Sequence, residues 1–182
     1  MRIISGKYAK RQLFTLKSQK TRPTSDKAKE SLFNSLGQFF NGGIVLDLYG
    51  GSGALGIEAV SRGFDRAVLN DMNRQATAII RKNVDLTKES EKFDIFTMRA
   101  DNCLKVLAEK SESFDLVFLD PPYAKQQIAK DMKKMLDLNL LNDQSRIVAE
   151  TDSDTELGEQ AGFSLIKQLK MGKTIVWIYR KD

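Results

Sequence analysis

Residues 44–56 read I-V-L-D-L-Y-G-G-S-G-A-L-G, an apolar run that passes directly into a cluster of glycines. The first five of these residues suit a strand buried on both faces, with Asp47 as its one charge. Gly51, Gly53 and Gly56 follow with the spacing G-x-G-x-x-G, at the turn from this strand into a helical segment. Glycine permits a positive φ and a close approach to a ligand, and the helix start presents free N–H groups. The stretch predicts a loop that binds a nucleotide-type cofactor.

Length and composition fit one soluble domain with a full hydrophobic core, since the chain has 182 residues of which 41% are hydrophobic and 29% charged. No run of about 18 apolar residues is present, so we expect no membrane-spanning helix. The first residues lack the apolar segment of a signal peptide. A single cysteine, Cys103, excludes an intrachain disulfide. We therefore expect a cytoplasmic protein, and a monomer because one core accounts for the apolar stripes.

The chain contains no histidine. This removes the commonest general base and the commonest metal ligand. A Ser–His–Asp mechanism and a zinc-hydrolase mechanism are excluded, and no metal site is predicted. The chemistry must use carboxylates, hydroxyls, backbone groups or a cofactor.

Positive charge is concentrated at the N-terminus, because residues 1–30 carry a net charge of +7 and the remaining 152 residues a net charge of −2. Such asymmetry favours a nucleic-acid partner over a merely solvated arm. Tyr8 lies among Lys7, Lys10 and Arg11, and two interpretations are open for it: stacking on a base, or packing on the domain. We divide the chain into a basic N-terminal extension of hairpin and helix, residues 1–40, and a catalytic domain, residues 41–182.

Strands and helices alternate along the chain. A helix begins after an N-cap at Thr24 or Ser25, carries an apolar stripe from Ala28 to Phe40 with Lys27, Lys29 and Glu30 mostly on its other faces, and ends at Asn41-Gly42-Gly43. The predicted strands cover 44–48, 66–71, 93–99, 114–119 and 146–150, with a terminal hairpin over 163–169 and 174–180. The predicted helices cover 54–62, 73–86, 102–109 and 126–138. This order indicates an α/β fold with a doubly wound, mostly parallel sheet.

Acidic residues follow several of these strands. In such sheets the ligand binds beyond the carboxyl ends of the strands. Asp47, Asp71, Asp101 and Asp120 all fall at or near those ends, and Asp71 lies 20 residues beyond Gly51, the spacing at which a carboxylate meets ribose hydroxyls. The sequence therefore predicts one cleft that these residues and the glycine loop share.

The second motif is D-P-P-Y at Asp120–Tyr123, directly after the fourth strand. Two successive prolines, Pro121 and Pro122, fix their own φ angles and remove two donors, so the Asp120 carboxylate and the Pro121 carbonyl form a rigid pair of acceptors. An exocyclic amine on a nucleobase is a poor nucleophile because its lone pair is delocalised. Two acceptors on its N–H groups would hold it, and Tyr123 could stack on the base.

These features together resemble class I S-adenosylmethionine-dependent N-methyltransferases. More narrowly, R-I-I-S-G, R-P-T-S-D-K-A-K-E-S-L-F-N, L-D-L-Y-G-G-S-G-A-L-G-I-E-A-V-S-R-G and D-P-P-Y resemble, in order, the RsmD family of bacterial 16S rRNA (guanine-N2)-methyltransferases. The resemblance implies a Rossmann-like, seven-stranded sheet with an antiparallel C-terminal hairpin. It also implies S-adenosylmethionine as cofactor, 16S rRNA of the small ribosomal subunit as partner, and no association with a membrane.

The resemblance assigns roles to individual residues. It places Asp47, Tyr49, Gly50, Gly51, Ser52 and Gly53 in the cofactor loop, Asp71 and Met72 at the ribose, Asp101 and Asn102 at the adenine, and Asp120, Pro121, Pro122 and Tyr123 at the target amine. The residues expected to meet RNA are Lys7, Arg11, Arg22, Pro23, Thr24 and Lys27. The chain departs from the family pattern at Tyr49 and Gly50, where phenylalanine and alanine are usual, and at Asp71, where glutamate is usual.

Other functions compete with this interpretation. D-P-P-Y does not name the base, so an adenine-N6 or other amino-group methyltransferase fits as well. An NAD-binding oxidoreductase would use the glycine loop but leaves D-P-P-Y without a purpose. A non-catalytic RNA-binding assembly factor would need neither motif intact.

Overall fold

The structure is a computed structural model and describes residues 1–16, 25–122 and 124–182. Predicted site residues Arg22, Pro23, Thr24 and Tyr123 therefore lie outside the described residues.

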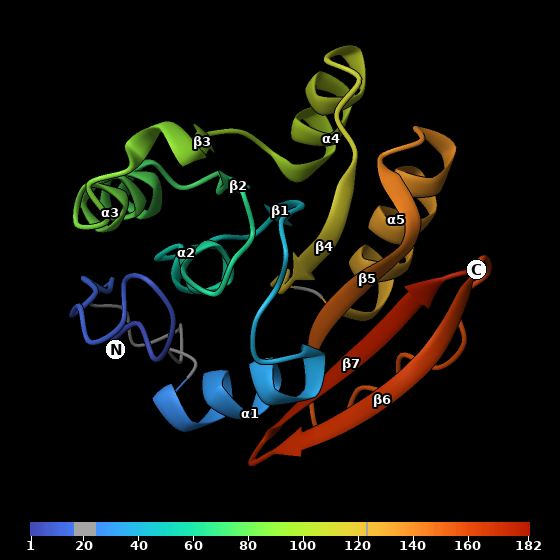
Figure 1. The fold of residues 1–182 in the computed structure, drawn as a ribbon. Coiled ribbons are helices and arrows are strands. Elements are labelled where there is room, and N and C mark those ends of the chain that lie inside the picture. Colours follow the sequence, from blue (N-terminus) through green and yellow to red (C-terminus); the bar gives the residue numbers. More distant parts are fainter. Residues whose placement is uncertain (17–24, 123) are drawn as a thin grey trace.

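Seven strands form one sheet in the order β3-β2-β1-β4-β5-β7-β6 (Figure 1). Neighbours among β1 to β5 pair in parallel, and β7 pairs antiparallel with both β5 and β6. The predicted doubly wound, mostly parallel sheet with an antiparallel C-terminal hairpin is confirmed. The strands are β1 (Ile44–Asp47), β2 (Arg66–Asn70), β3 (Phe93–Phe96), β4 (Phe114–Leu119), β5 (Leu141–Asp152), β6 (Phe163–Met171) and β7 (Thr174–Lys181).

Helices cover both faces of this sheet (Figure 1). Apolar residues of α1, α2 and α3 pack on one face, and those of α4 and α5 on the other. Within the described ranges, no helix is long and apolar enough to cross a membrane. The helices are α1 (Asp26–Leu36), α2 (Ala54–Ser61), α3 (Arg74–Asp85), α4 (Ala100–Glu109) and α5 (Ala124–Asp137), with a short 3₁₀ turn at Ser90–Lys92.

The largest differences from the predicted element boundaries concern three elements, α1, β3 and β5. Helix α1 does begin after Ser25, whose hydroxyl accepts from the Ala28 N–H at 3.1 Å, but it ends at Leu36 because Gly37 has a φ of 111°. Strand β3 ends at Phe96, so Asp101 lies in the first turn of α4. Strand β5 is longer than the predicted 146–150, because it pairs with β4 on one side and β7 on the other.

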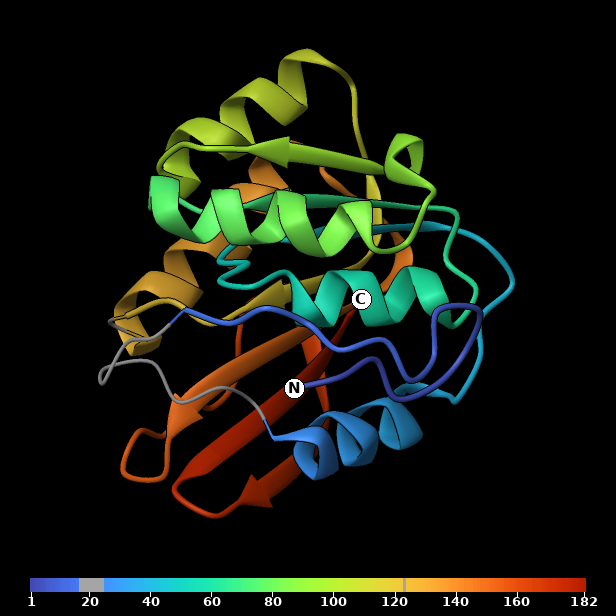
Figure 2. The same cartoon turned by 90° about the vertical axis from the view of Figure 1, so that its left-hand side faces the viewer.

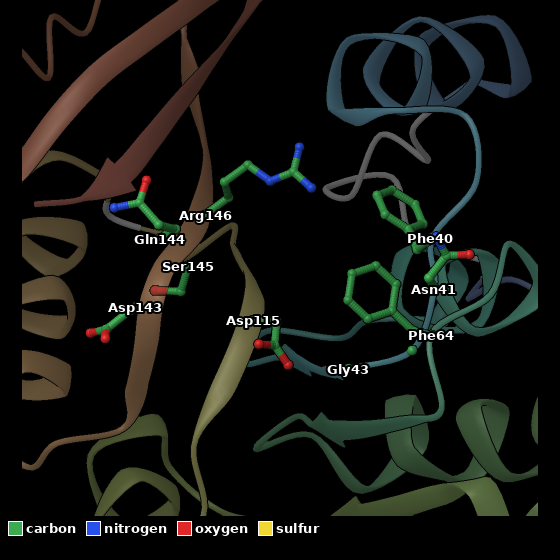
Figure 3. Close-up of a pocket in the computed structure, with 10 residues that line it drawn as sticks. Phe40, Asn41, Gly43, Phe64, Asp115, Asp143, Gln144, Ser145 and Arg146 are labelled. Carbon is green, nitrogen blue, oxygen red and sulfur yellow. The ribbon is translucent and has the colours of Figure 1, made fainter.

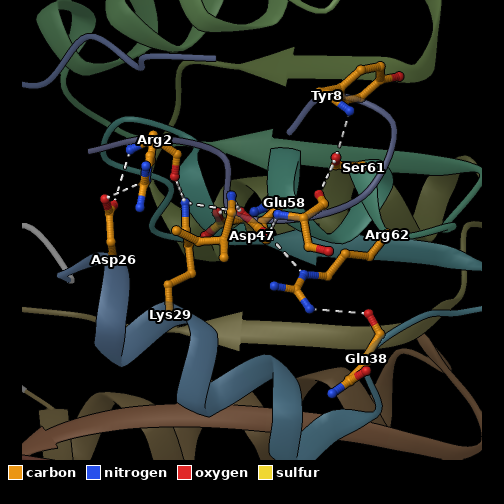
Figure 4. Close-up of polar contacts among 12 residues, drawn as sticks. Arg2, Tyr8, Asp26, Lys29, Gln38, Asp47, Glu58, Ser61 and Arg62 are labelled. Carbon is orange, nitrogen blue, oxygen red and sulfur yellow. Dashed lines mark hydrogen bonds and ion pairs between the residues drawn. The ribbon is translucent and has the colours of Figure 1, made fainter. Parts of the chain in front are cut away.

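The N-terminal segment is tied to the body of the molecule by a buried carboxylate. Glu58 of α2 is fully buried and accepts from the backbone N–H groups of Ile4 and Ser5, at 2.9 and 3.0 Å (Figure 4). It also pairs with Lys29 at 3.1 Å and with Arg62 at 2.8 Å. The expectation that Lys29 lies on a polar face of its helix is wrong, because the whole side chain is buried against Glu58.

Candidate active site

The parallel strands β1, β2 and β4 end at one edge of the sheet, which we call the carboxyl edge. Asp47 is the last residue of β1, Asp71 follows β2 and Asp120 follows β4. Because these strands are neighbours in the order β2-β1-β4, the topology brings the three carboxylates together. In the strand register Asp47 is level with Leu69 of β2 and Phe118 of β4, and Asp71 and Asp120 follow directly after those strands.

The glycine loop at this edge is held by backbone donors. Gly50 donates its N–H to the Asn70 carbonyl at 2.7 Å, and Gly51 donates to Asp71 Oδ2 at 3.0 Å. Gly51 and Gly53 have φ angles of 57° and 78°, in the left-handed region that favours glycine. A Cβ on Gly51 would meet no atom within 4 Å, so the loop presents open backbone at this point.

Gly56 has a different role from the other two glycines of the motif. A Cβ at this position would lie 2.2 Å from Leu69 Cδ2, so glycine allows α2 to pack closely on β2. Its N–H donates to Asp47 Oδ2 at 3.2 Å. The three glycines thus have three roles: open backbone at Gly51, a left-handed turn at Gly53 and a close helix–strand contact at Gly56. These are the roles expected of glycines at a nucleotide-binding turn.

The carboxylates of the carboxyl edge are poorly compensated. Burial raises the pKa of Asp47 to about 7, against the opposing effect of the Gly56 N–H, and the charges of Asp120 and Asp71 add to the rise. Burial and the neighbouring Asp152 raise the pKa of Asp120 to about 6. Burial, Asp120 and Asp152 raise the pKa of Glu150 to about 7. Perturbed acids of this kind gather at functional sites.

Asp120 stands where the predicted motif requires it. Asp120 is exposed at the surface, but the protein atoms around its carboxyl group still disfavour the charged form and so raise its pKa. Pro121 is buried, and Pro122 is exposed and lies at a bend shortly after β4 ends at Leu119. The carboxylate is therefore anchored on a rigid element while its face remains accessible.

Asp101 and Asn102 lie in the first turn of α4, both exposed. The Asp101 carboxylate pairs with Lys134 of α5 and with Lys105 at 3.2 Å, and these two ammonium groups lower its pKa, Lys134 most strongly. A group that binds the Asp101 carboxylate would have to share it with both lysines. Met72 is 66% exposed beside Asp71.

Two residues of the site escaped the sequence analysis. Asn70 is buried at the end of β2 and donates to the carbonyls of Leu48 and Met98, at 3.0 and 3.1 Å. Asp131 of α5 is buried and accepts from the Tyr49 hydroxyl at 2.5 Å. For Asn70 the sequence offers only a weak signal of a site residue, namely a polar side chain at the end of a strand. No sequence pattern marks Asp131. Together they link the glycine loop to β2, to the segment after β3 and to α5.

The residues expected to meet RNA are only partly available in this structure. Lys7 pairs with Glu89 at 2.6 Å, and Arg11 donates to the Thr87 carbonyl at 3.1 Å while its guanidinium lies 5.2 Å from the centre of the Tyr8 ring. Lys27 is exposed in the first turn of α1. Tyr8 itself is only 1% exposed. Of the two interpretations left open for it, stacking on a base and packing on the domain, the structure therefore supports the second.

A cavity of about 330 Å³ lies away from the carboxyl edge, next to the beginnings of β1 and β4 (Figure 3). Arg146 donates to the Leu36 carbonyl there and lies 5.8 Å from the centre of the Phe40 ring. Phe40 in turn packs on Phe64, with ring centres 4.5 Å apart. These contacts fix the end of α1 to the sheet, and none of the predicted site residues that the structure describes lines the cavity. Elsewhere too, the described residues hold no cluster of three or more His, Cys, Asp or Glu suited to a metal ion.

The sheet order, the terminal hairpin and the glycine loop after β1 define a Rossmann-like class I methyltransferase fold. A solved structure of the Escherichia coli protein yhhF matches it with a TM-score of 0.85 at 27% identity, over 100% of this chain and 98% of that chain.

The chain belongs to the family described as Conserved hypothetical protein 95, the RsmD family, whose model matches residues 1–180. The protein YlbH of Bacillus subtilis is 37% identical over 100% of this chain and 99% of its own length. Ribosomal RNA small subunit methyltransferase D of Haemophilus influenzae is 30% identical over 99% of this chain and 93% of its own length.

Proposed function

We propose that this chain transfers a methyl group from S-adenosylmethionine to the exocyclic N2 of a specific guanine in 16S rRNA. The observation that carries the proposal is the position of Asp120, an accessible carboxylate on the end of β4, beside Asp47 and the open glycine loop. The printed name of the Haemophilus influenzae relative, which specifies small subunit ribosomal RNA, supports the substrate class.

The carboxyl edge fits S-adenosylmethionine in three respects. The open backbone at Gly51 gives a cradle for a ligand, and the Asp71 carboxylate stands beside it with lone pairs left for ribose hydroxyls. Asp47, with little compensation for its charge, suits the positive charge of the cofactor. The bound cofactor would supply an electrophilic methyl group on a sulfonium.

The target amine would be held by acceptors of this chain. Asp120 Oδ and the Pro121 carbonyl would accept from its two N–H groups, which directs the nitrogen lone pair and keeps the base in place. With a pKa of about 6, the Asp120 carboxylate is mainly ionised at neutral pH and is a strong acceptor. Tyr123, outside the described residues, would stack on the base. The base must be unpaired or flipped out of its helix to reach these groups.

RNA recognition would use the basic N-terminal extension, residues 1–40, and the catalytic domain, residues 41–182, would act on the target guanine. We also propose that the protein is a monomer and lies in the cytoplasm. Lys27 is available without rearrangement, whereas Lys7 and Arg11 would have to exchange their present partners for phosphates. Ribosomal proteins of a partly or fully assembled subunit would complete the surface that is recognised.

The test is methyl transfer from tritiated S-adenosylmethionine to small ribosomal subunits and to naked 16S rRNA, both lacking their native methylations, followed by digestion to nucleosides. We expect label in N2-methylguanosine. Label in N6-methyladenosine would instead identify an adenine methyltransferase, and absence of both label and cofactor binding would refute the enzyme.

A further inference from the structure

One buried side chain joins the N-terminal segment to the glycine loop. Asn83 of α3 is fully buried. Its Oδ1 accepts from the Phe14 N–H at 2.7 Å, and its Nδ2 donates to the Phe14 carbonyl at 2.9 Å and to the Ser52 carbonyl at 2.8 Å. All the donors of this amide are used, and both backbone groups of Phe14 are fixed. Phe14 therefore has a defined position next to Ser52.

The course of the chain brings Phe14 to the carboxyl edge. The N-terminal segment folds back on itself in a turn near the end of α2, where the Lys7 N–H donates to the Ser61 carbonyl at 2.8 Å. It then runs alongside α2, toward the side of the molecule on which α2 and α3 begin (Figure 2). Asp71, Met72 and the glycine loop lie on that side, because each directly precedes one of these helices.

The Phe14 side chain is 52% exposed, although its neighbour Leu13 is buried and its own backbone is held by a buried amide. An aromatic ring with a fixed backbone and a free face is a suitable platform for a nucleobase, because every base presents a flat π-surface and little conformational entropy is lost on stacking. Tyr8, the other aromatic residue described in this segment, is buried and cannot serve.

We propose that Phe14 stacks on an RNA base at the carboxyl edge and that Asn83 positions it there. This inference rests on the proposed function and adds a residue that neither the glycine loop nor D-P-P-Y contains. The ligand is an unpaired base of the RNA strand that carries the target, and the contact needs no particular base, since stacking is tolerant of sequence.

The experiment compares Phe14→Ala, Phe14→Leu and Phe14→Trp with the wild-type chain in the methyl-transfer assay, with KM measured separately for RNA and for S-adenosylmethionine. Ile166→Ala is the matched control, because Ile166 is also an exposed apolar residue, 50% exposed, and lies on β6, outside both the carboxyl edge and the N-terminal extension. Each variant changes an exposed side chain, so thermal unfolding should not differ from wild type by more than a few degrees.

We expect KM for RNA to rise about 5- to 100-fold in Phe14→Ala, in line with the loss of one stacked base. Phe14→Leu should show most of this increase, Phe14→Trp little of it, and Ile166→Ala none. KM for S-adenosylmethionine should stay within about 2-fold of wild type, a margin of roughly 0.4 kcal/mol.

Two results would overturn the inference. An unchanged KM for RNA in Phe14→Ala would show that the ring contacts no base, and a rise confined to S-adenosylmethionine would show that it packs on the cofactor instead. Both results require an active wild-type chain, so they are distinct from failure of the proposed function, in which wild type itself transfers no methyl group.

Discussion

Helix α2 carries one buried carboxylate and begins beside a second, and the two have opposite environments. Glu58, on the helix, accepts from two backbone N–H groups and pairs with Lys29 and Arg62. Asp47, beside the start of the helix, accepts from one donor among the described residues, the Gly56 N–H, and burial raises its pKa to about 7. A buried charge with full compensation fixes structure, whereas a buried charge with little compensation is available for a ligand.

Removing the compensated carboxylate, Glu58, should give the largest effect, a loss of stability. Glu58→Ala leaves Lys29 and Arg62 buried without their anion and the N–H groups of Ile4 and Ser5 without an acceptor. We expect the free energy of unfolding to fall by about 3–5 kcal/mol. Urea denaturation at pH 7.5 measures it. Asp94→Ala, which removes a half-exposed partner of Arg66, should change the same quantity by less than about 1 kcal/mol. Equal losses in both variants would contradict this view of Glu58.

Removing an uncompensated carboxylate should affect activity and leave stability intact. Asp120→Asn keeps the shape of the side chain but replaces one acceptor by a donor. We expect kcat for methyl transfer to fall about 100-fold or more. The melting temperature at pH 8 should be unchanged or higher, because a charge disfavoured by burial is gone. Asp143→Asn, fully exposed at the other edge of the sheet, is the control. If Asp120→Asn loses activity only in proportion to its loss of folded protein, Asp120 has no direct role at the target amine.

A smaller effect is expected at the cofactor. Asp71→Ala removes the acceptor proposed for the ribose hydroxyls and the partner of the Gly51 N–H. The dissociation constant for S-adenosylmethionine should rise about 10-fold or somewhat more, the range of one charge-assisted hydrogen bond. Isothermal titration calorimetry measures it. Asp85→Ala, an exposed aspartate at the opposite end of α3, should bind like wild type. Unchanged binding in Asp71→Ala would remove this residue from the site.

The smallest effect concerns pH. The folded-state pKa values of Asp47, Asp120 and Glu150 are raised to about 7, 6 and 7, so the folded chain binds protons more tightly than the unfolded chain. Stability should therefore increase as pH falls from 8 to about 5. Glu89 acts in the opposite sense, since Lys7 and Tyr8 lower its pKa to about 2, but its contribution is lost only in stronger acid. Melting temperatures in buffers of constant ionic strength test the sign. A fall over this interval would mean that these acids are compensated in solution.

The sequence predicted the fold well because the signals were local. The apolar run before Asp47, the glycine spacing and the alternation of strands and helices each depend on residues close in the chain, and all appear in the sheet as expected. Asp47, Asp71 and Asp120 could be assigned to one edge because parallel strands end on the same side of a sheet. Boundaries set by pairing, such as both ends of β5, were predicted less accurately.

The sequence by itself determined the class of fold, the residues at the strand ends and the family. Only the tertiary structure decided which polar residues are compensated. Lys29 and Glu58, 29 positions apart, form a buried pair, and Tyr49 meets Asp131, 82 positions away. It also decided that Tyr8 packs inside while Phe14 stays exposed next to Ser52. Burial and pairing between distant residues depend on how whole helices and strands pack against one another. They could not be predicted because this packing leaves no pattern among residues that are close in the sequence.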